Sequence, residues 1–144
     1  VPGIIGMSIA AKVVAKDLQE DSKRITCLRN KLENMILASV PGSNVNGDIT
    51  NRLCNTTNIS FPNKDAAVLV EKLSSNGIYV SAGAACTTGG EPSHVLQAMG
   101  CSPELANSSL RFSLGKFTTE KEIEIAGKRI PEVINSCLDV YSIK

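Results

Sequence analysis

The residue best suited to chemistry in this sequence is Cys86, which lies among small residues. Glycine, alanine and threonine flank it within residues 81–90 (SAGAACTTGG), without a bulky apolar neighbour or an obvious disulfide partner. The thiolate is the nucleophilic form of cysteine, and partial exposure near a helix N-terminus or a cation increases its population. We therefore interpret Cys86 as a reactive thiol on a loop. The alternative is an incidental buried cysteine in a turn, because free cysteine is often buried.

Arg111 is the second candidate for a functional role. Residues 109–114 (SLRFSL) alternate apolar and polar side chains, which predicts a half-buried strand with Arg111 pointing away from the core. The planar guanidinium of arginine can hold a carboxylate through two parallel hydrogen bonds. Beside a reactive thiol, such an arginine could hold an amino-acid substrate. The alternative is a solvated arginine in a weak surface ion pair.

His94 is the only histidine, eight residues beyond Cys86. A cysteine and a histidine could act as nucleophile and base, as in thiol hydrolases. The first turn of a helix that Pro92 opens is the place we expect for His94, which favours a structural or helix-orienting role. Gly89 and Gly90 lack the strand and lysine of a phosphate-binding loop, so they indicate loop flexibility.

The other cysteines do not suggest a metal site or a disulfide framework. The chain has five cysteines, an odd number, and no two are separated by only two residues. This spacing indicates a reducing compartment and no zinc site. Cys137 falls on the apolar stripe of the last predicted helix, so we expect it in the core. Cys27 and Cys54 are interpreted as incidental thiols, and the sequence suggests no role for Cys101.

The elements that must position these residues follow an α/β pattern. Hydrophobic spacing and turn residues predict helices over 2–40, 65–76 and 93–99 and from Thr119 onward, and strands over 44–46, 57–61, 77–80 and 109–114. Glu122 completes a capping box with Thr119, and Pro131 is expected to kink or split that last helix. These elements predict a small mixed or antiparallel sheet of three or four strands, with helices packed largely on one face.

Size and charge limit the classes of protein further. The 144 residues are close to the usual size of one domain. A net charge of +1 with scattered basic residues gives no electrostatic footprint for nucleic acid. The sequence has no apolar stretch approaching the roughly 20 residues that span a bilayer. We expect a soluble, cytoplasmic protein that binds neither nucleic acid nor membrane.

Four ordered stretches resemble one family of enzymes. They are residues 1–6 (VPGIIG), 58–61 (NISF), 81–100 (SAGAACTTGGEPSHVLQAMG) and 108–120 (SSLRFSLGKFTTE). In this order they are similar to the NifS/IscS-type cysteine desulfurases, which belong to the class V aminotransferases. The resemblance spans essentially the whole chain. It departs at a loop after Cys86 that is one residue shorter, and at Cys54 and Asn107, where proline and histidine are common.

The resemblance implies a fold and a place in a larger enzyme. The chain corresponds to the C-terminal small domain of a fold-type I pyridoxal-phosphate enzyme, as a single domain over 1–144 with a helical region at 1–40 and an α/β sheet region at 41–144. The lysine, histidine and aspartate that hold the cofactor belong to the large domain of such enzymes. We therefore expect pyridoxal 5'-phosphate in the full-length enzyme, no cofactor-binding residue in this chain, and no activity of this chain alone.

The resemblance also implies roles for the two candidates. Cys86 would take the sulfur of L-cysteine as a persulfide and release alanine, while Arg111 would bind the substrate carboxylate. The persulfide would pass to a sulfur-acceptor protein such as an iron–sulfur scaffold, and the full-length enzyme would be a homodimer. Two alternatives stay open: a selenocysteine lyase or sulfinate desulfinase of the same fold, and a stand-alone sulfur-carrier or interaction module without catalysis.

Overall fold

The computed structural model describes residues 1–83 and 92–139. Its elements are, in chain order, α1 (Pro2–Ser39), β1 (Asn44–Val45), β2 (Thr56–Ser60), α2 (Ala66–Ser75), α3 (His94–Ala98), α4 (Pro103–Asn107), β3 (Ser109–Ser113) and α5 (Glu120–Ser136). The strands form one antiparallel sheet in the order β1-β2-β3. This arrangement confirms the small antiparallel sheet with helices that the sequence predicts.

The two faces of the sheet differ because side chains alternate along each strand. Ile59 of β2 and Leu110 and Phe112 of β3 are buried on one face. The rings of Phe61 and Phe112 meet edge to face with centroids 6.4 Å apart. Arg111 and its partner Asn58 occupy the opposite, polar face. The alternation in residues 109–114 therefore predicted correctly which side of β3 faces the core.

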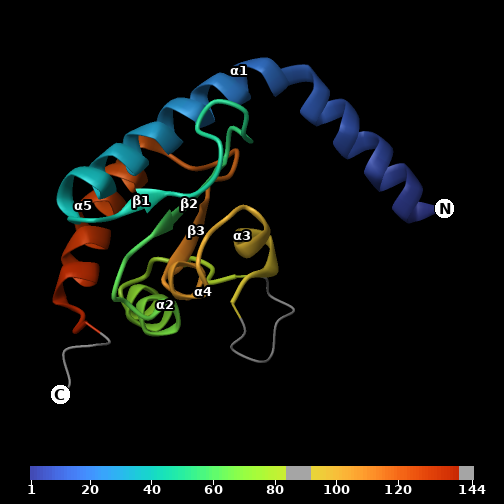
Figure 1. Cartoon of the computed structure of the whole chain (residues 1–144). Helices are drawn as coiled ribbons and strands as arrows, with labels where there is room; N and C mark the ends of the chain where they lie inside the picture. Colours follow the sequence, from blue (N-terminus) through green and yellow to red (C-terminus); the bar gives the residue numbers. More distant parts are fainter. Residues whose placement is uncertain (84–91, 140–144) are drawn as a thin grey trace.

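Three helices bury the apolar face of the sheet. The main cluster draws on Ile25, Leu28, Leu32 and Ile36 of α1, Ala66, Leu69 and Leu73 of α2, and Ile123, Ile130, Val133 and Ile134 of α5. Helix α5 runs along α1, and α2 lies against α5 and β3. The short helices α3 and α4 lie apart from α1 and α5, next to the sheet (Figure 1). The polar face of the sheet is thus left largely uncovered by the long helices.

Capping residues explain where several helices begin. Asp65 accepts hydrogen bonds from the backbone of Ala67 and Val68 at the start of α2. Thr119 and Glu122 form the predicted capping box at the start of α5. Both pairings satisfy backbone N–H groups that have no partner inside the helix. Local sequence chemistry therefore placed these two helix starts correctly.

Four local expectations were wrong or incomplete. Residues 77–80 form no strand, and the pairing there is a single bridge between Ser81 and Arg111. Helix α5 continues through Pro131 as one helix, so the split that was one of the two expected effects of this proline does not occur. Pro92 precedes the N-cap Ser93 instead of entering the first turn of α3. Helix α4, which Ser102 caps, was not predicted.

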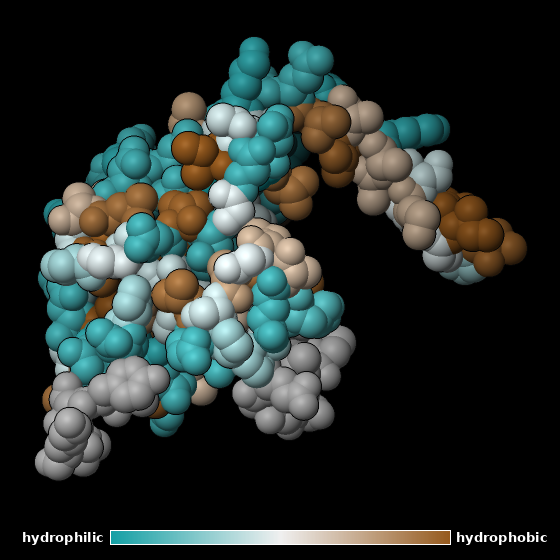
Figure 2. Space-filling model, viewed as in Figure 1, coloured by the Kyte–Doolittle hydropathy of each residue, from teal (hydrophilic) through white to brown (hydrophobic). Residues whose placement is uncertain are grey.

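The first half of α1 extends beyond the body of the molecule (Figure 1). Buried residues of this helix begin only at Ile25. Figure 2 shows hydrophobic residues along the projecting part with nothing packed over them. They are Ile4, Ile5, Met7, Ile9, Val13, Val14 and Leu18, each more than half exposed. Within the described ranges, no helix combines the length and the hydropathy needed to cross a membrane.

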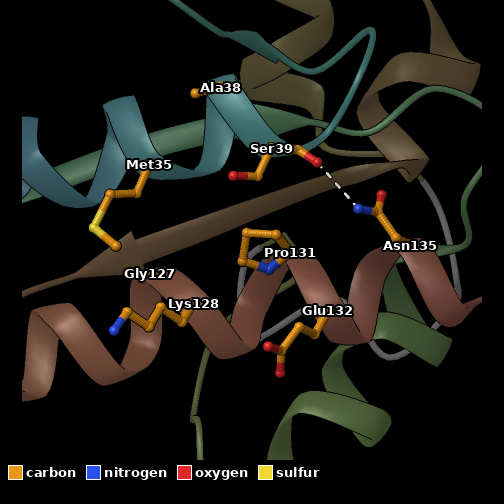
Figure 3. Close-up of a pocket in the computed structure, with 8 residues that line it drawn as sticks. All are labelled: Met35, Ala38, Ser39, Gly127, Lys128, Pro131, Glu132 and Asn135. Carbon is orange, nitrogen blue, oxygen red and sulfur yellow. Dashed lines mark hydrogen bonds between the residues drawn. The ribbon is translucent and has the colours of Figure 1, made fainter.

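A shallow groove lies between the last turns of α1 and the middle of α5 (Figure 3). Met35 of α1 points at Gly127 of α5, and an added Cβ at Gly127 would lie 2.4 Å from the Met35 sulfur. Asn135 closes one end of the groove by donating a hydrogen bond to the backbone oxygen of Ser39, at 3.0 Å. Gly127 therefore allows the close approach of the two helices, and the groove contains none of the predicted site residues.

Candidate functional site

Arg111 lies in the middle of β3 with its side chain exposed on the polar face. Its backbone N–H donates to the oxygen of Ser81 at 2.7 Å, and its oxygen accepts from the Ser81 N–H at 3.2 Å. Both backbone groups of Arg111 therefore point away from β2. As a result, Arg111 and Asn58 form a pair without backbone hydrogen bonds between them, the type in which opposite side chains lie closest.

Four polar residues form a row across the sheet on this face. The register places Asn58 opposite Arg111, and Arg111 opposite Ser81. The N–H of Asn46 donates to the Asn58 oxygen at 2.8 Å, which extends the pairing of β1 and β2 by one residue. Directly opposite residues present their side chains on the same face, with Cβ atoms about 5 Å apart. Asn46, Asn58, Arg111 and Ser81 thus lie side by side; we call them the polar row.

Hydrogen bonds fix one end of the polar row. The Asn46 amide nitrogen donates to Asn58 Oδ1 at 2.7 Å and to Ser109 Oγ at 3.0 Å. Ser109 in turn donates to the backbone oxygen of Leu105 at 2.5 Å. The Cys101 thiol lies 3.7 Å from Asn46 Oδ1. The side chain of Asn58 is therefore held through its oxygen by Asn46.

The polar row suits an anion. Among the described residues, no carboxylate forms an ion pair with Arg111. A guanidinium beside amide donors matches the paired oxygens of a carboxylate. This face therefore carries hydrogen-bond donors that are suited to a negatively charged group.

The other predicted site residues are distributed as follows. Cys86, Gly89 and Gly90 lie outside the described residues. His94 is exposed at the first position of α3, and the side chain of Ser93 caps that helix. Ser81, five residues before Cys86, belongs to the polar row. The structure therefore ties the start of the segment that carries Cys86 to the strand that carries Arg111.

The remaining cysteines lie apart from the polar row except Cys101. Cys137 is buried in the core and its thiol donates to the backbone oxygen of Val133 at 3.2 Å, which confirms its predicted packing role. Cys27 is exposed and Cys54 is half-buried. Across the described ranges, no three cysteine, histidine or acidic side chains come together as metal ligands would.

A buried ion pair was missed from the sequence. Both carboxylate oxygens of Glu33 accept from the Arg52 guanidinium, at 2.7 and 2.9 Å, and Thr57 donates to the same carboxylate at 2.5 Å. Burial raises the pKa of Glu33, but the bonds from Arg52 and Thr57 outweigh it and hold the pKa below its usual range. The available signal was the charged pair Arg29 and Glu33, one helical turn apart, beside the apolar stripe that holds Leu32.

This ion pair supports the polar row from the core side. Thr57 precedes Asn58 on β2 and points to the opposite face. Arg29 of α1 also donates to the backbone oxygen of Leu53, at 2.8 Å. Together these contacts join α1 to the segment between β1 and β2, so they fix the position of the strand that presents Asn58.

The sequence pattern of the aminotransferase class-V family matches residues 1–125. The chain belongs to this family. A cysteine desulfurase of Nostoc sp. (strain PCC 7120) is 44% identical to this chain over 135 residues. The match covers 93% of this chain and 34% of that relative. The cysteine desulfurase NifS of Azotobacter vinelandii is 40% identical over 132 residues, covering 91% of this chain and 33% of the relative.

Solved structures agree with this class-V assignment. A NifS-like protein superposes with a TM-score of 0.81 at 33% identity, over 94% of this chain and 34% of that protein. A NifS-like protein from Rickettsia africae superposes with a TM-score of 0.77 at 31% identity, over 90% of this chain and 33% of that protein. The class-V chain thus spans about a third of the length of the relatives it matches.

Proposed function

We propose that this chain is the small domain of a pyridoxal-phosphate-dependent cysteine desulfurase. In this proposal the longer parent enzyme removes the sulfur of L-cysteine, leaves it as a persulfide on Cys86, and releases alanine. Pyridoxal phosphate, bound by other parts of the parent, would withdraw the electrons that make the carbon–sulfur bond cleavable. Support comes from the desulfurase names of the relatives and from the anion-binding character of the polar row.

The observation that carries the proposal is the bridge between Ser81 and Arg111. Cys86 follows Ser81 by five residues. Five residues of chain reach at most about 18 Å, so Cys86 stays within that distance of Ser81. A carboxylate on Arg111 would therefore place the rest of a small amino acid within range of the Cys86 thiol.

In the transfer itself, the thiolate sulfur of Cys86 attacks the sulfur of the bound cysteine. A sulfur–sulfur bond forms and the carbon–sulfur bond of the substrate breaks, with the electron pair left on the substrate carbon, which is protonated to give alanine. Arg111 would hold the substrate carboxylate throughout. The persulfide would then pass its outer sulfur to an acceptor thiol, such as that of an iron–sulfur scaffold protein. We also propose that the parent is a cytoplasmic homodimer.

Mass spectrometry of the full-length parent after incubation with L-cysteine tests this function. We expect one additional sulfur on the tryptic peptide that contains Cys86, removable by a thiol reductant. The Cys86→Ala variant should lose alanine production while it keeps the absorbance of its bound cofactor. The matched control is Cys27→Ala, at an exposed thiol on α1, which should retain full activity. A Cys86→Ala variant that still forms alanine, or a wild-type enzyme without the additional sulfur, would overturn the proposal.

A further inference from the structure

We propose that Asn58 is a second ligand of the substrate carboxylate, with its amide N–H donating beside the guanidinium of Arg111. The inference rests on the proposed function and names the residues that select an amino acid over a simple amine. Arg111 alone would supply a positive charge and two parallel N–H donors. Asn58 would add a neutral donor in a fixed position next to it.

The donors and acceptors in the hydrogen bonds from Asn46 and Ser109 determine which side-chain group of Asn58 can contact a ligand. Leu105 contributes a backbone oxygen, which can only accept, so Ser109 must use its single proton there. The oxygen of Ser109 then accepts from Asn46, whose NH₂ group also donates to Asn58. The oxygen of Asn58 is thereby engaged as an acceptor. Its NH₂ group, with two donors, is the part of the side chain that remains for a ligand.

The position of Asn58 follows from the sheet register. Asn58 and Arg111 are directly opposite in a pair without backbone hydrogen bonds, where Cα atoms lie about 4.5 Å apart. Their side chains share the polar face, and Asn58 is half-buried. A carboxylate that accepts two parallel bonds from Arg111 still has lone pairs on each oxygen. The amide of Asn58 is therefore placed to donate to one of those oxygens.

Asn46 makes this arrangement rigid before any ligand binds. Its backbone donates to the Asn58 backbone and its side chain donates to the Asn58 side chain. A donor that is already oriented loses little conformational entropy on binding, which strengthens the contact. We therefore expect Asn58 to contribute to the affinity for the substrate carboxylate.

The experiment compares two ligands on the full-length holoenzyme by calorimetric titration. L-Alanine carries the carboxylate, whereas ethylamine shares the amine and carbon chain but lacks the carboxylate. Asn58→Ala should lower the affinity for L-alanine about tenfold, as expected for the loss of one hydrogen bond to a charged group. The affinity for ethylamine should not change. Asn58→Asp should weaken L-alanine roughly a hundredfold, because its carboxylate would occupy the Arg111 guanidinium itself.

Ser113→Asp is the matched control. It introduces the same charge on the same face of β3, two residues from Arg111, at an exposed position. It should change the affinity for L-alanine by no more than about threefold, because exposed charges at that separation interact weakly. Thermal unfolding of each variant verifies that the fold is retained.

Several results would overturn the inference. One is that Asn58→Ala lowers the affinity for both ligands equally, or for neither. Another is that Ser113→Asp lowers the affinity for L-alanine as much as Asn58→Asp does. A third is that the wild-type enzyme binds L-alanine no more tightly than ethylamine. Failure of the proposed function is seen separately, as wild-type enzyme that binds L-alanine but places no sulfur on Cys86. The two proposals therefore fail on different measurements.

Discussion

At the scale of single residues, Arg111 and Asn58 are informative because the backbone register, and not proximity in sequence, brings them together. They are 53 positions apart in the chain and directly opposite in the sheet. The alternating pattern around Arg111 predicted its exposed face. The pairing of Arg111 with Asn58 could not be predicted from the sequence, because the register of two distant strands depends on the packing of their apolar faces.

Replacement of Arg111 tests the carboxylate contact directly. Arg111→Lys keeps the charge but replaces a planar fork by a single ammonium group. We expect kcat/KM of the full-length enzyme for L-cysteine to fall by roughly ten- to a hundredfold, mainly through a higher KM, because a bidentate charged contact is lost. Steady-state kinetics provides the measurement, and unchanged constants would exclude the role of Arg111.

The buried Glu33 predicts a stability that depends on pH. Its pKa in the folded chain lies below the ordinary value of 4.5, despite burial, because Arg52 and Thr57 bond its charged form. The resulting stabilisation is complete above that ordinary value and is lost as the pH falls through the lower pKa of the folded state. Glu33→Gln should therefore reduce the free energy of unfolding by about 3 kcal/mol at pH 7.

Urea unfolding at several pH values measures this effect. The difference in the free energy of unfolding between wild type and Glu33→Gln should shrink as the pH is lowered from 5 toward about 2. At low pH the Glu33 carboxylate of the wild type is protonated and loses the charge that the variant lacks. Glu71→Gln, at an exposed position of α2, is the matched control and should show no difference at neutral pH. A Glu33→Gln effect that stays constant with pH would contradict the assignment.

At the scale of elements, local signals predicted helix starts well and weak strands poorly. Asp65 and the Thr119 capping box act within one turn, so the sequence contains all the information that sets them. Residues 77–80 have apolar side chains suited to a strand, yet Ser81 makes the only bridge there. Pairing requires a partner edge, and a short segment does not reveal whether one is available.

The contact of α5 with α1 gives a second prediction at this scale. A Cβ at Gly127 would overlap the Met35 side chain, so Gly127→Ala alone should bring no net stabilisation, or a loss of up to about 2 kcal/mol. In a Met35→Ala background the overlap with the Met35 sulfur and Cε disappears, and a tight 3.2 Å contact between the two Cβ atoms remains. There Gly127→Ala should stabilise the chain by up to about 1 kcal/mol through the higher helix propensity of alanine.

A double-mutant cycle of unfolding free energies measures this coupling. We expect an interaction of about 1–3 kcal/mol between the two positions, with the pair of substitutions better tolerated than the sum of the single ones. Gly3→Ala on the projecting part of α1, where an added Cβ meets no atom within 4 Å, serves as the propensity control. Strict additivity at Gly127 and Met35 would show that the close approach is not energetically significant.

At the scale of the whole molecule, the helix α1 consists of two halves with different surroundings. The half from Ile25 onward packs against α5 and the sheet, whereas the half before Leu18 has no buried residue. At the end of that half, Asp17 forms an ion pair with Lys116 at 3.0 Å. The sequence predicted the full length of the helix from its periodicity. It could not show that only one half would be covered, because apolar residues appear with similar spacing in both.

Hydrogen exchange should distinguish these two halves of α1. Backbone hydrogen bonds in a helix without tertiary packing open easily, since isolated helices of this length are marginal in water. We expect amides of residues 6–18 to exchange at least about a hundredfold faster than amides of residues 28–36. Mass spectrometry of peptic fragments gives this comparison. Equal protection would mean that the apolar half is covered, for example by a second copy of the chain, which sedimentation at two concentrations would detect.

The bridge between Ser81 and Arg111 has a consequence for how such proteins can diversify. Because Ser81 is bridged to Arg111, residues inserted into or deleted from the segment 84–91 would alter the spacing between this bridge and Cys86 while Arg111 stays in place. In the proposed function, natural selection could then change the reach of the Cys86 thiol independently of the carboxylate contact of Arg111. Lineages that transfer sulfur to different acceptors could vary this one segment and inherit the sheet intact.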